Sequence, residues 1–355
     1  MLRTSPILRE KKTIQQQFFK HHRSEIPLDF LSKPIHTETM PLPSSAPITV
    51  VGSLNMDLIA SVQRLPSPGE TVAALGITRR FGGKGANQAL AASRHGASVS
   101  FIGCLGEDPD GRDYRNHLRR EGINCSAVGS IRNHPTGSAI IAVDAAGENQ
   151  IIVIPGANGQ LSGPTVKMQR SRIAVSKALL VQLEVPLETV VDAIGIANQT
   201  NVPVVLNPSP ANDAFPWGKV SIQHLIVNAT EAQVLFELDP TNAKEEIADW
   251  RKKLTAMKIG TLLITRGAEP TMILTANSFD QVPAIEVKPI DTVGAGDAFA
   301  GAYTCQIAEG APPLQAVLWA NAAGALATQK EGAQEGIPLR GDVQSLLQKQ
   351  GHEVQ

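Results

Sequence analysis

The sequence contains few cysteines and few aromatic residues. Its three cysteines, Cys104, Cys125 and Cys305, are an odd number, and no two of them form a Cys-x-x-Cys pair. This pattern argues against a disulfide framework and against a structural zinc site, and it is typical of a reducing compartment. Aromatic residues make up 4% of the chain, too few for the stacking platforms that bind single-stranded nucleic acid.

The sequence also lacks an excess of charge and a long apolar run. The formal net charge is -1, so nothing attracts the chain electrostatically to nucleic acid or to an acidic membrane. The best apolar candidate, residues 317–327, is interrupted by Asn321 and is shorter than the roughly 20 residues that a membrane helix needs. We therefore expect a soluble protein with neither a nucleic-acid partner nor a membrane partner.

Residues 1–46 differ in composition from the rest of the chain. Basic residues outnumber acidic ones up to Arg23, and a Pro-rich stretch at 41–47 is typical of a linker. We expect a disordered extension over 1–46 and a folded domain over 47–345, followed by a C-terminal tail over 346–355. The expected location is cytoplasmic. A transit peptide to a plastid or mitochondrion is the alternative, although acidic residues within the extension count against it.

Most of the remaining chain alternates between two patterns. Apolar, often β-branched runs predict strands at 48–52, 99–103, 178–183, 202–207, 225–228, 261–265 and 282–287. The segments between them predict helices at 85–95, 110–121, 187–199, 230–238 and 243–257, with a further helix from 298 onward. This alternation predicts a three-layer α/β fold, in which helices cover both faces of a mostly parallel sheet.

Two segments interrupt the alternation. Residues 58–81 and 137–155 each contain strand-like runs around turn residues, which predicts hairpins. We expect the hairpins to pair into a small separate sheet, with lid segments at about 56–81 and 136–155. Such a sheet would cover a site at the carboxyl ends of the main strands. The alternative is a peripheral decoration without a role in binding.

The first of two Gly-rich loops spans residues 81–87 and reads FGGKGAN. It precedes a predicted helix, and its glycines allow the backbone to approach a ligand closely. It is not a P-loop, because Lys84 is followed by Gly85 instead of Ser or Thr. By itself such a loop is also consistent with an ordinary turn.

The second Gly-rich loop spans residues 291–297 and reads DTVGAGD. Gly294 and Gly296 stand at the start of a predicted helix, where unpaired amides and the helix dipole favour an anion. Phe299 stands where a dinucleotide fingerprint requires Gly. Asp297 is either a first-turn carboxylate that the dipole favours or a general base beside the anion site. The second interpretation suits phosphoryl transfer to an alcohol.

Several further motifs accompany these loops along the chain. They are Asn55-Met56-Asp57, FGGKGANQ at 81–88, QLE at 182–184, NPSP at 207–210, NATE at 228–231, DTVGAGDAF at 291–299 and KEGAQ at 330–334. In these segments the chain resembles the ribokinase-like (PfkB) family of carbohydrate and nucleoside kinases, and within it the ribokinases, from residue 48 to about 345. The resemblance implies ATP-dependent phosphorylation of D-ribose at its 5-hydroxyl. A related substrate (fructose, deoxyribose, a nucleoside or a keto-deoxy acid) and a non-catalytic sugar sensor are the alternatives.

The resemblance also implies roles for individual residues. Asp297 would be the general base, beside an anion hole at Gly294, Ala295 and Gly296. The sugar would be bound by Asn55, Met56, Asp57, Gly83, Lys84, Gly85, Ala86, Asn87, Glu184 and Asp297. ATP would lie along Asn228, Thr265, Arg266, Gly267, Ala268, Glu269, Pro270, Gly296, Asp297 and Asn321.

Two cations and a homodimer follow from the same resemblance. Mg²⁺ would be held through water by Asn228 and Glu231. K⁺ would be bound by the side chain of Asp291 and by backbone carbonyls of Val293, Ala327, Lys330, Gly332 and Gly336. The dimer would form by packing of one lid on another.

Some of these residues have simpler interpretations or depart from the family pattern. Asn228 and Glu231 would equally suit the cap and first turn of a helix. Glu184 follows an apolar strand, where an unpaired carboxylate is costly, so a ligand role is favoured. Pro270 removes a backbone amide from the nucleotide loop. Gly336 stands where ribokinases often have Ser.

Overall fold

The computed structural model describes residues 46–352. The expected extension and transit peptide therefore lie outside the described residues, apart from Ala46. That residue is buried, and its carbonyl oxygen accepts a hydrogen bond from the Ser98 amide (3.0 Å), so the folded domain includes it. Between residues 46 and 352, no helix has both the length and the apolar character to cross a membrane.

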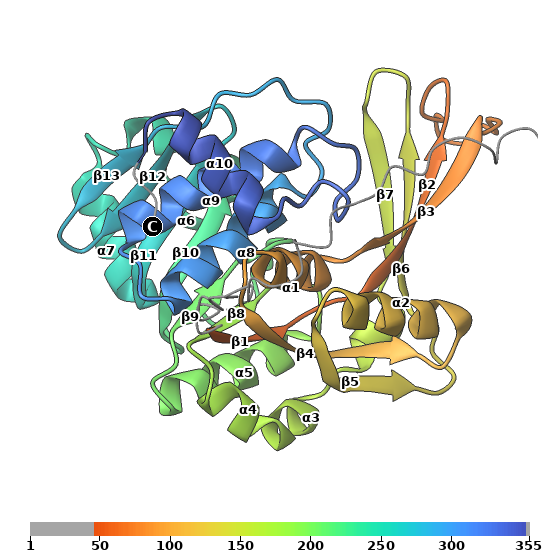
Figure 1. Cartoon of the computed structure of the whole chain (residues 1–355), viewed down its shortest axis with the longest axis horizontal. Coiled ribbons are helices and arrows are strands. Elements are labelled where there is room, and N and C mark those ends of the chain that lie inside the picture. The colour runs from red at the N-terminus through yellow and green to blue at the C-terminus, as the bar shows by residue number, and fades with distance from the viewer. Residues whose placement is uncertain (1–45, 353–355) are drawn as a thin grey trace, which may run out of the picture. The chain divides into compact units, whose positions relative to one another are not determined.

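A nine-stranded sheet forms the centre of the domain (Figure 1), in the order β13-β12-β11-β10-β9-β8-β1-β4-β5. The strands are β1 (Pro47–Val51), β4 (Ser98–Gly106), β5 (Asn124–Ile131), β8 (Ala178–Val181), β9 (Val204–Leu206), β10 (Ile222–Asn228), β11 (Ile259–Arg266), β12 (Glu269–Thr275) and β13 (Phe279–Val282). From β11 to β5, every strand runs parallel to its neighbours. At one edge of the sheet, β12 pairs antiparallel with β11, and β13 pairs antiparallel with β12. The predicted mostly parallel sheet is confirmed.

Helices cover both faces of this sheet, as predicted. One face packs against α1 (Lys84–Arg94), α2 (Pro109–Arg120), α8 (Ala295–Ala308), α9 (Pro313–Ala327) and α10 (Arg340–Lys349). The other packs against α3 (Gly163–Met168), α4 (Arg170–Ala174), α5 (Leu187–Gln199), α6 (Ala229–Phe236) and α7 (Ile247–Met257). Successive strand side chains alternate between two cores: Val50 contributes to the first and Val51 to the second. Central strands are therefore apolar on both faces.

A second, four-stranded sheet has the order β3-β2-β6-β7 and is called the lid sheet below (Figure 1, upper right). Its strands are β2 (Asn55–Ser61), β3 (Gly76–Gly82), β6 (Gly137–Val143) and β7 (Asn149–Ile154). The pairs β2–β3 and β6–β7 are antiparallel hairpins, and β2–β6 joins them in parallel. The prediction that the two hairpins build a small separate sheet is confirmed.

Three expectations about element boundaries are wrong. The predicted strand at 282–287 is absent: β13 ends at Val282, and Pro283 has no amide to extend a strand. Ile285 is nevertheless buried, because this run packs into the first core without pairing. The boundary expected at residue 345 falls inside α10, which continues to Lys349 and buries Leu347. The helix predicted from 243 begins at Ile247.

Candidate active site

The predicted site residues gather at the carboxyl edge of the main sheet. Glu184 follows β8, Asn207 follows β9, Asn228 ends β10 and Arg266 ends β11. The two Gly-rich loops enter the same region at the starts of α1 and α8, which are packed side by side. Parallel strands bring distant segments together at this edge, where open α/β sheets bind their ligands.

Asp297 lies in the first turn of α8 and is 8% exposed. Its Oδ2 atom accepts a hydrogen bond from Asn87 Nδ2 (2.9 Å), and its Oδ1 atom accepts one from Gln88 Nε2 (2.9 Å). Gly301 permits this contact between helices, because a Cβ there would collide with Ala91 of α1. The two Gly-rich loops, predicted separately, therefore meet through the carboxylate of Asp297.

The start of α8 has the geometry of an anion site. Gly294 precedes the helix with φ +80°, and a Cβ on it would lie 2.7 Å from Ala333 Cα. A Cβ on Gly296 would meet nothing within 4 Å. The first-turn amides have no partners within the helix, and the space beside Gly296 leaves room for a group that they could bind.

The first Gly-rich loop is held against the segment that links β1 to β2. Glu184 Oε2 accepts hydrogen bonds from the Lys84 amide (2.9 Å) and from the hydroxyl of Ser53. Gly83 has φ +89°, and a Cβ on Gly85 would collide with the Ser53 amide. Glycine at both positions therefore allows the predicted sugar-binding loop to lie directly on the end of β1.

The lid sheet contributes Asn55, Met56 and Asp57 from β2. Asn55 and Met56 are buried, and Asn55 Oδ1 accepts a hydrogen bond from Asn158 Nδ2 (2.8 Å). Burial and, to a smaller extent, the nearby carboxylates of Glu184, Asp297 and Glu335 together raise the pKa of Asp57 to about 7. Acidic groups therefore converge beside the first Gly-rich loop. A polyol, which offers hydroxyl donors without adding negative charge, suits such a place.

At the end of β10, Asn228 and Glu231 form a reciprocal capping box at the start of α6. Asn228 Oδ1 accepts from the Glu231 amide (2.8 Å), and Glu231 Oε2 accepts from the Asn228 amide (3.0 Å). The simpler interpretation of these residues as a helix cap is therefore present in the structure. It leaves Glu231 Oε1 and the second lone pair of Asn228 Oδ1 unused, so a water-mediated metal role is compatible with it.

The predicted nucleotide loop is the turn of the β11–β12 hairpin. Arg266 forms an ion pair with Glu269 (2.7 Å), and its Nε atom donates to the carbonyl of Pro270 (2.9 Å). Gly267 has φ +62° at the turn, and Ala268 follows it. Thr265, at the end of β11, donates through its hydroxyl to the Val227 carbonyl (3.4 Å).

Asn321 lies on α9 and bridges that helix to the edge of the sheet. Its Oδ1 accepts from Thr271 Oγ1 (2.7 Å), and its Nδ2 donates to the carbonyl of Pro283 (2.9 Å). These bonds occupy both ends of the amide. The structure thus assigns Asn321 a bridging function, and the proximity to adenine that the resemblance implied remains a prediction.

The predicted K⁺ ligands also come together. Asp291 accepts from the amides of Val293 (3.0 Å) and Gly332 (2.8 Å). A Cβ on Gly336 would lie 2.6 Å from the carbonyl oxygen of Ala327 and 3.0 Å from that of Gly332. Backbone oxygens therefore converge around Gly336. Lys330 lies in the same loop and is exposed.

Comparison with known proteins identifies the family. Residues 45–340 match the model of the pfkB family carbohydrate kinases. The chain belongs to this family. It is 36% identical to the ribokinase of Haemophilus influenzae, covering 85% of this chain and 98% of that one, and 36% identical to the ribokinase of Schizosaccharomyces pombe, covering 82% and 94%. The structure of Arabidopsis thaliana ribokinase complexed with ribose and ATP superposes on this one with a TM-score of 0.78 at 28% identity. The match covers 85% of this chain and 99% of the Arabidopsis chain.

Sequence reasoning assigned no role to several buried polar residues of this pfkB kinase. They are Ser53, Gln88, Asn158, Gln182 and Gln334. Asn158 orients Asn55, while Gln334 donates to Asn87 Oδ1 (2.9 Å). Two signals were available: Gln88, Gln182 and Gln334 stand within the quoted motifs, and Gln88 is an amide inside the Ala-rich α1 helix. Such a residue must find a buried partner, but the sequence does not say which.

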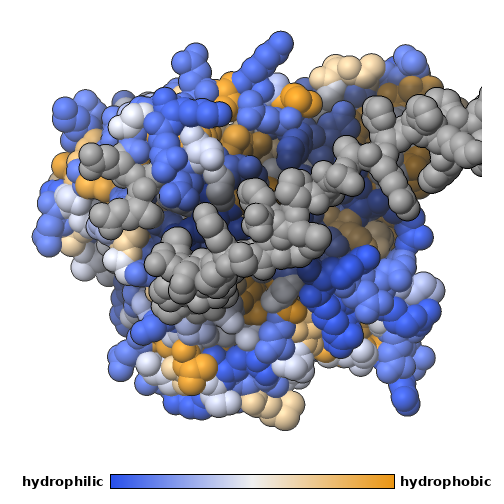
Figure 2. All heavy atoms as spheres, in the orientation of Figure 1, coloured by the Kyte–Doolittle hydropathy of each residue, from blue (hydrophilic) through white to orange (hydrophobic). Residues whose placement is uncertain are grey.

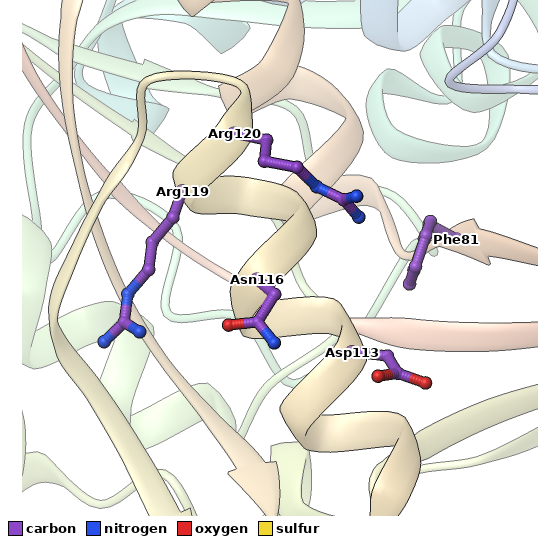
Figure 3. A pocket seen from close by; sticks show the side chains of 5 residues that line it. All are labelled: Phe81, Asp113, Asn116, Arg119 and Arg120. Carbon is purple, nitrogen blue, oxygen red and sulfur yellow. The ribbon is translucent and has the colours of Figure 1, made fainter.

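The pfkB kinase also has a surface pocket outside this site, with a volume of about 640 Å³. Figure 3 shows its lining on α2 and β3: Phe81, Asp113, Asn116, Arg119 and Arg120. The ring of Phe81 stacks on His117, with centroids 4.2 Å apart. Of these residues, only Phe81 belongs to a predicted motif, so the pocket lies beside the first Gly-rich loop and not among the proposed reacting groups.

Proposed function

We propose that the protein transfers the γ-phosphoryl group of ATP to the 5-hydroxyl of D-ribose. The observation that carries the proposal is the buried carboxylate of Asp297, held by two amides at the start of α8 beside the open space at Gly296. The identity to two ribokinases over almost their whole length supports ribose as the acceptor.

The proposed chemistry is an in-line displacement. Asp297 takes the proton of the 5-hydroxyl as its oxygen bonds to the γ-phosphorus. The bond between that phosphorus and the β,γ-bridging oxygen breaks, and ADP leaves. The amides at the start of α8 stabilise the negative charge on the transferred group. Glu184, Asp57 and Asn55 orient the sugar so that one hydroxyl faces Asp297.

Two cations complete the proposal. Mg²⁺ is held through water by Asn228 and Glu231, whose oxygen atoms suit a hard ion that retains its hydration. Its charge stabilises the phosphates of ATP. K⁺ is held by Asp291 and by the carbonyls around Gly336, since a set of oxygen donors suits such an ion. The convergence of the Ala327 and Gly332 carbonyls supports this site.

The decisive measurement is ADP formation by the purified full chain with ATP, Mg²⁺, K⁺ and each member of a substrate panel. We expect D-ribose to give the highest kcat/KM among ribose, fructose, deoxyribose, nucleosides and a keto-deoxy acid. Omission of Mg²⁺ should abolish turnover, and replacement of K⁺ by a bulky organic cation should lower it. A higher kcat/KM for another panel member would reject ribose, and ribose binding without ADP formation would favour a sensor.

A homodimer through the lid sheet is part of the proposal. Strand β7 is exposed along its whole length and forms one edge of that sheet. Ile77, Ile151, Ile152 and Val153 are each more than half exposed, and Figure 2 shows hydrophobic side chains at the upper right, where Figure 1 places these strands. Ile152 pairs with Ile140 of β6, which is also exposed, and exposed apolar side chains grouped in this way are typical of an interface.

We expect the wild-type chain to sediment as a dimer and Ile152→Lys to sediment as a monomer, because a buried, unpaired lysine is strongly unfavourable in an apolar interface. Val234→Lys is the matched control, since Val234 is a similarly exposed apolar residue (59%, against 63% for Ile152) on α6. It should remain dimeric. Sedimentation velocity at micromolar concentration distinguishes these outcomes, and a monomeric wild type would refute the interface.

A further inference from the structure

Behind Asp297 lies a chain of amide side chains, two of them fully buried, that the proposed chemistry does not use. Gln88 Nε2 donates to Asp297 Oδ1 (2.9 Å) and to Asn207 Oδ1 (3.0 Å). Gln88 Oε1 accepts from Gln182 Nε2 (2.6 Å). Gln88 and Gln182 both have 0% exposure. The chain therefore runs from the end of β8, through α1, to the carboxylate in α8.

Gln182 is unusual because its second polar atom has no partner. Its Oε1 atom is buried without a hydrogen bond among the described residues, and it lies against Gly52. A buried acceptor without a donor opposes folding. Gln182 therefore contributes one hydrogen bond, to Gln88, while leaving an unfavourable group in the core. Methionine has a similar length, lacks the branched amide and would remove that group.

The bond from Gln182 determines which end of the Gln88 amide faces Asp297. With Oε1 of Gln88 directed to Gln182, its Nε2 must face the carboxylate. Asn87 is oriented in the same way on the other side: its Oδ1 accepts from Gln334 Nε2 (2.9 Å), which directs its own Nδ2 to Asp297 Oδ2 (2.9 Å). Each carboxylate oxygen thus accepts from an amide that a second buried amide orients.

We infer that Gln88 is a positioning residue for the base and that Gln182 acts through it. This inference rests on the proposed role of Asp297. Two donors, one on each oxygen, define the plane of the carboxylate and leave its remaining lone pairs toward the acceptor hydroxyl. Reaction rates depend steeply on such alignment. Substrate affinity depends on it little, because neither glutamine is among the residues proposed to contact ribose or ATP.

The sharpest test is Gln182→Met. We expect kcat to fall about three- to ten-fold, since Gln88 loses the bond that orients it. The KM values for ribose and ATP should stay within about twofold of wild type. The melting temperature should change little, because the variant removes the unpaired oxygen of Gln182 but leaves Gln88 Oε1 without its donor. If Gln182 had a purely structural role, its replacement would not lower kcat while leaving the melting temperature nearly unchanged.

Gln88→Leu removes the donor itself, and we expect kcat to fall by about 10- to 100-fold with KM again nearly constant. Gln306→Leu is the matched control: Gln306 is a buried glutamine in the same helix as Asp297, near its opposite end. It should keep the wild-type kcat. If Gln88→Leu does not fold, Gln182→Met still decides the question.

The outcomes separate this inference from the proposed function. Full activity of Asp297→Asn would contradict the role of the base. An inactive Asp297→Asn together with wild-type kcat for Gln182→Met would overturn only the positioning role. A Gln182→Met variant that loses kcat together with thermal stability, or that mainly raises KM, would overturn it as well.

Discussion

Replacement of Asp297 by asparagine is expected to lower kcat by roughly 10²- to 10⁴-fold, the usual contribution of a general base. An amide cannot accept the hydroxyl proton. Both oxygens of Asp297 accept hydrogen bonds from amide groups, so the asparagine NH₂ would also face a donor on one side. We expect this conflict to lower the free energy of unfolding by about 1–3 kcal/mol, which leaves the protein folded. Turnover by coupled ADP assay and unfolding by circular dichroism measure the two effects.

Asp342→Asn provides a control that matches the change in helix position. Asp297 and Asp342 are both the third residue of their helices, α8 and α10. The helix dipole favours a carboxylate equally at both positions. If Asp297 only stabilised its helix, the two variants would behave alike. Equal and near-normal activity of both would therefore rule out the base and support the simpler interpretation of the motif.

Replacement of Gly294 by alanine is expected to lower both stability and turnover. Its φ of +80° disfavours any residue with a Cβ, at a cost of about 1–2 kcal/mol, and the added Cβ would lie 2.7 Å from both Cα and the carbonyl oxygen of Ala333. Because these are backbone atoms, the start of α8 or the loop around Ala333 must shift. Displacement of the amides at the helix start should lower kcat by about 10²-fold, comparable to the loss of one oxyanion donor.

Gly296→Ala distinguishes the effect of backbone strain on stability from a direct effect on phosphoryl transfer. Gly296 lies inside α8, where an added Cβ meets nothing within 4 Å. Alanine there should raise the free energy of unfolding by about 0.5–1 kcal/mol, while its methyl group enters the space proposed for the phosphoryl group. We expect Gly294→Ala to melt below wild type and Gly296→Ala at or above it, with turnover lowered in both. Wild-type stability and turnover of Gly294→Ala would contradict this account.

Local sequence patterns predicted much of the fold because their causes are local. The apolar run at 48–52 indicated a strand buried on both faces, and β1 is such a strand. Turn residues within 58–81 and 137–155 indicated hairpins, which form the lid sheet. The prediction of a strand at 282–287 was wrong because hydrophobicity indicates burial and does not indicate hydrogen bonding to a neighbouring strand. Ile285 is buried without joining the sheet.

The candidate site likewise combines local features, which the sequence predicts, with long-range contacts, which it does not. Glycines at 83 and 294 could be assigned from sequence because each has a positive φ within its own loop, whereas Gly85 is required by its contact with Ser53 of another segment. The placement of the polar side chains relative to one another is not a local feature, since Asn87 is 210 residues from Asp297 and 247 residues from Gln334. No local pattern encodes contacts over such separations.

The sequence by itself determined the α/β alternation, the two Gly-rich helix starts and, through family resemblance, the residues proposed for the chemistry. Only the tertiary structure decided which polar groups meet. It directed Asn321 to the sheet edge and joined Gln182 through Gln88 to Asp297. The physical reason is that a buried amide must find a partner, and the packing of β8, α1 and α8 alone determines which partner lies within reach.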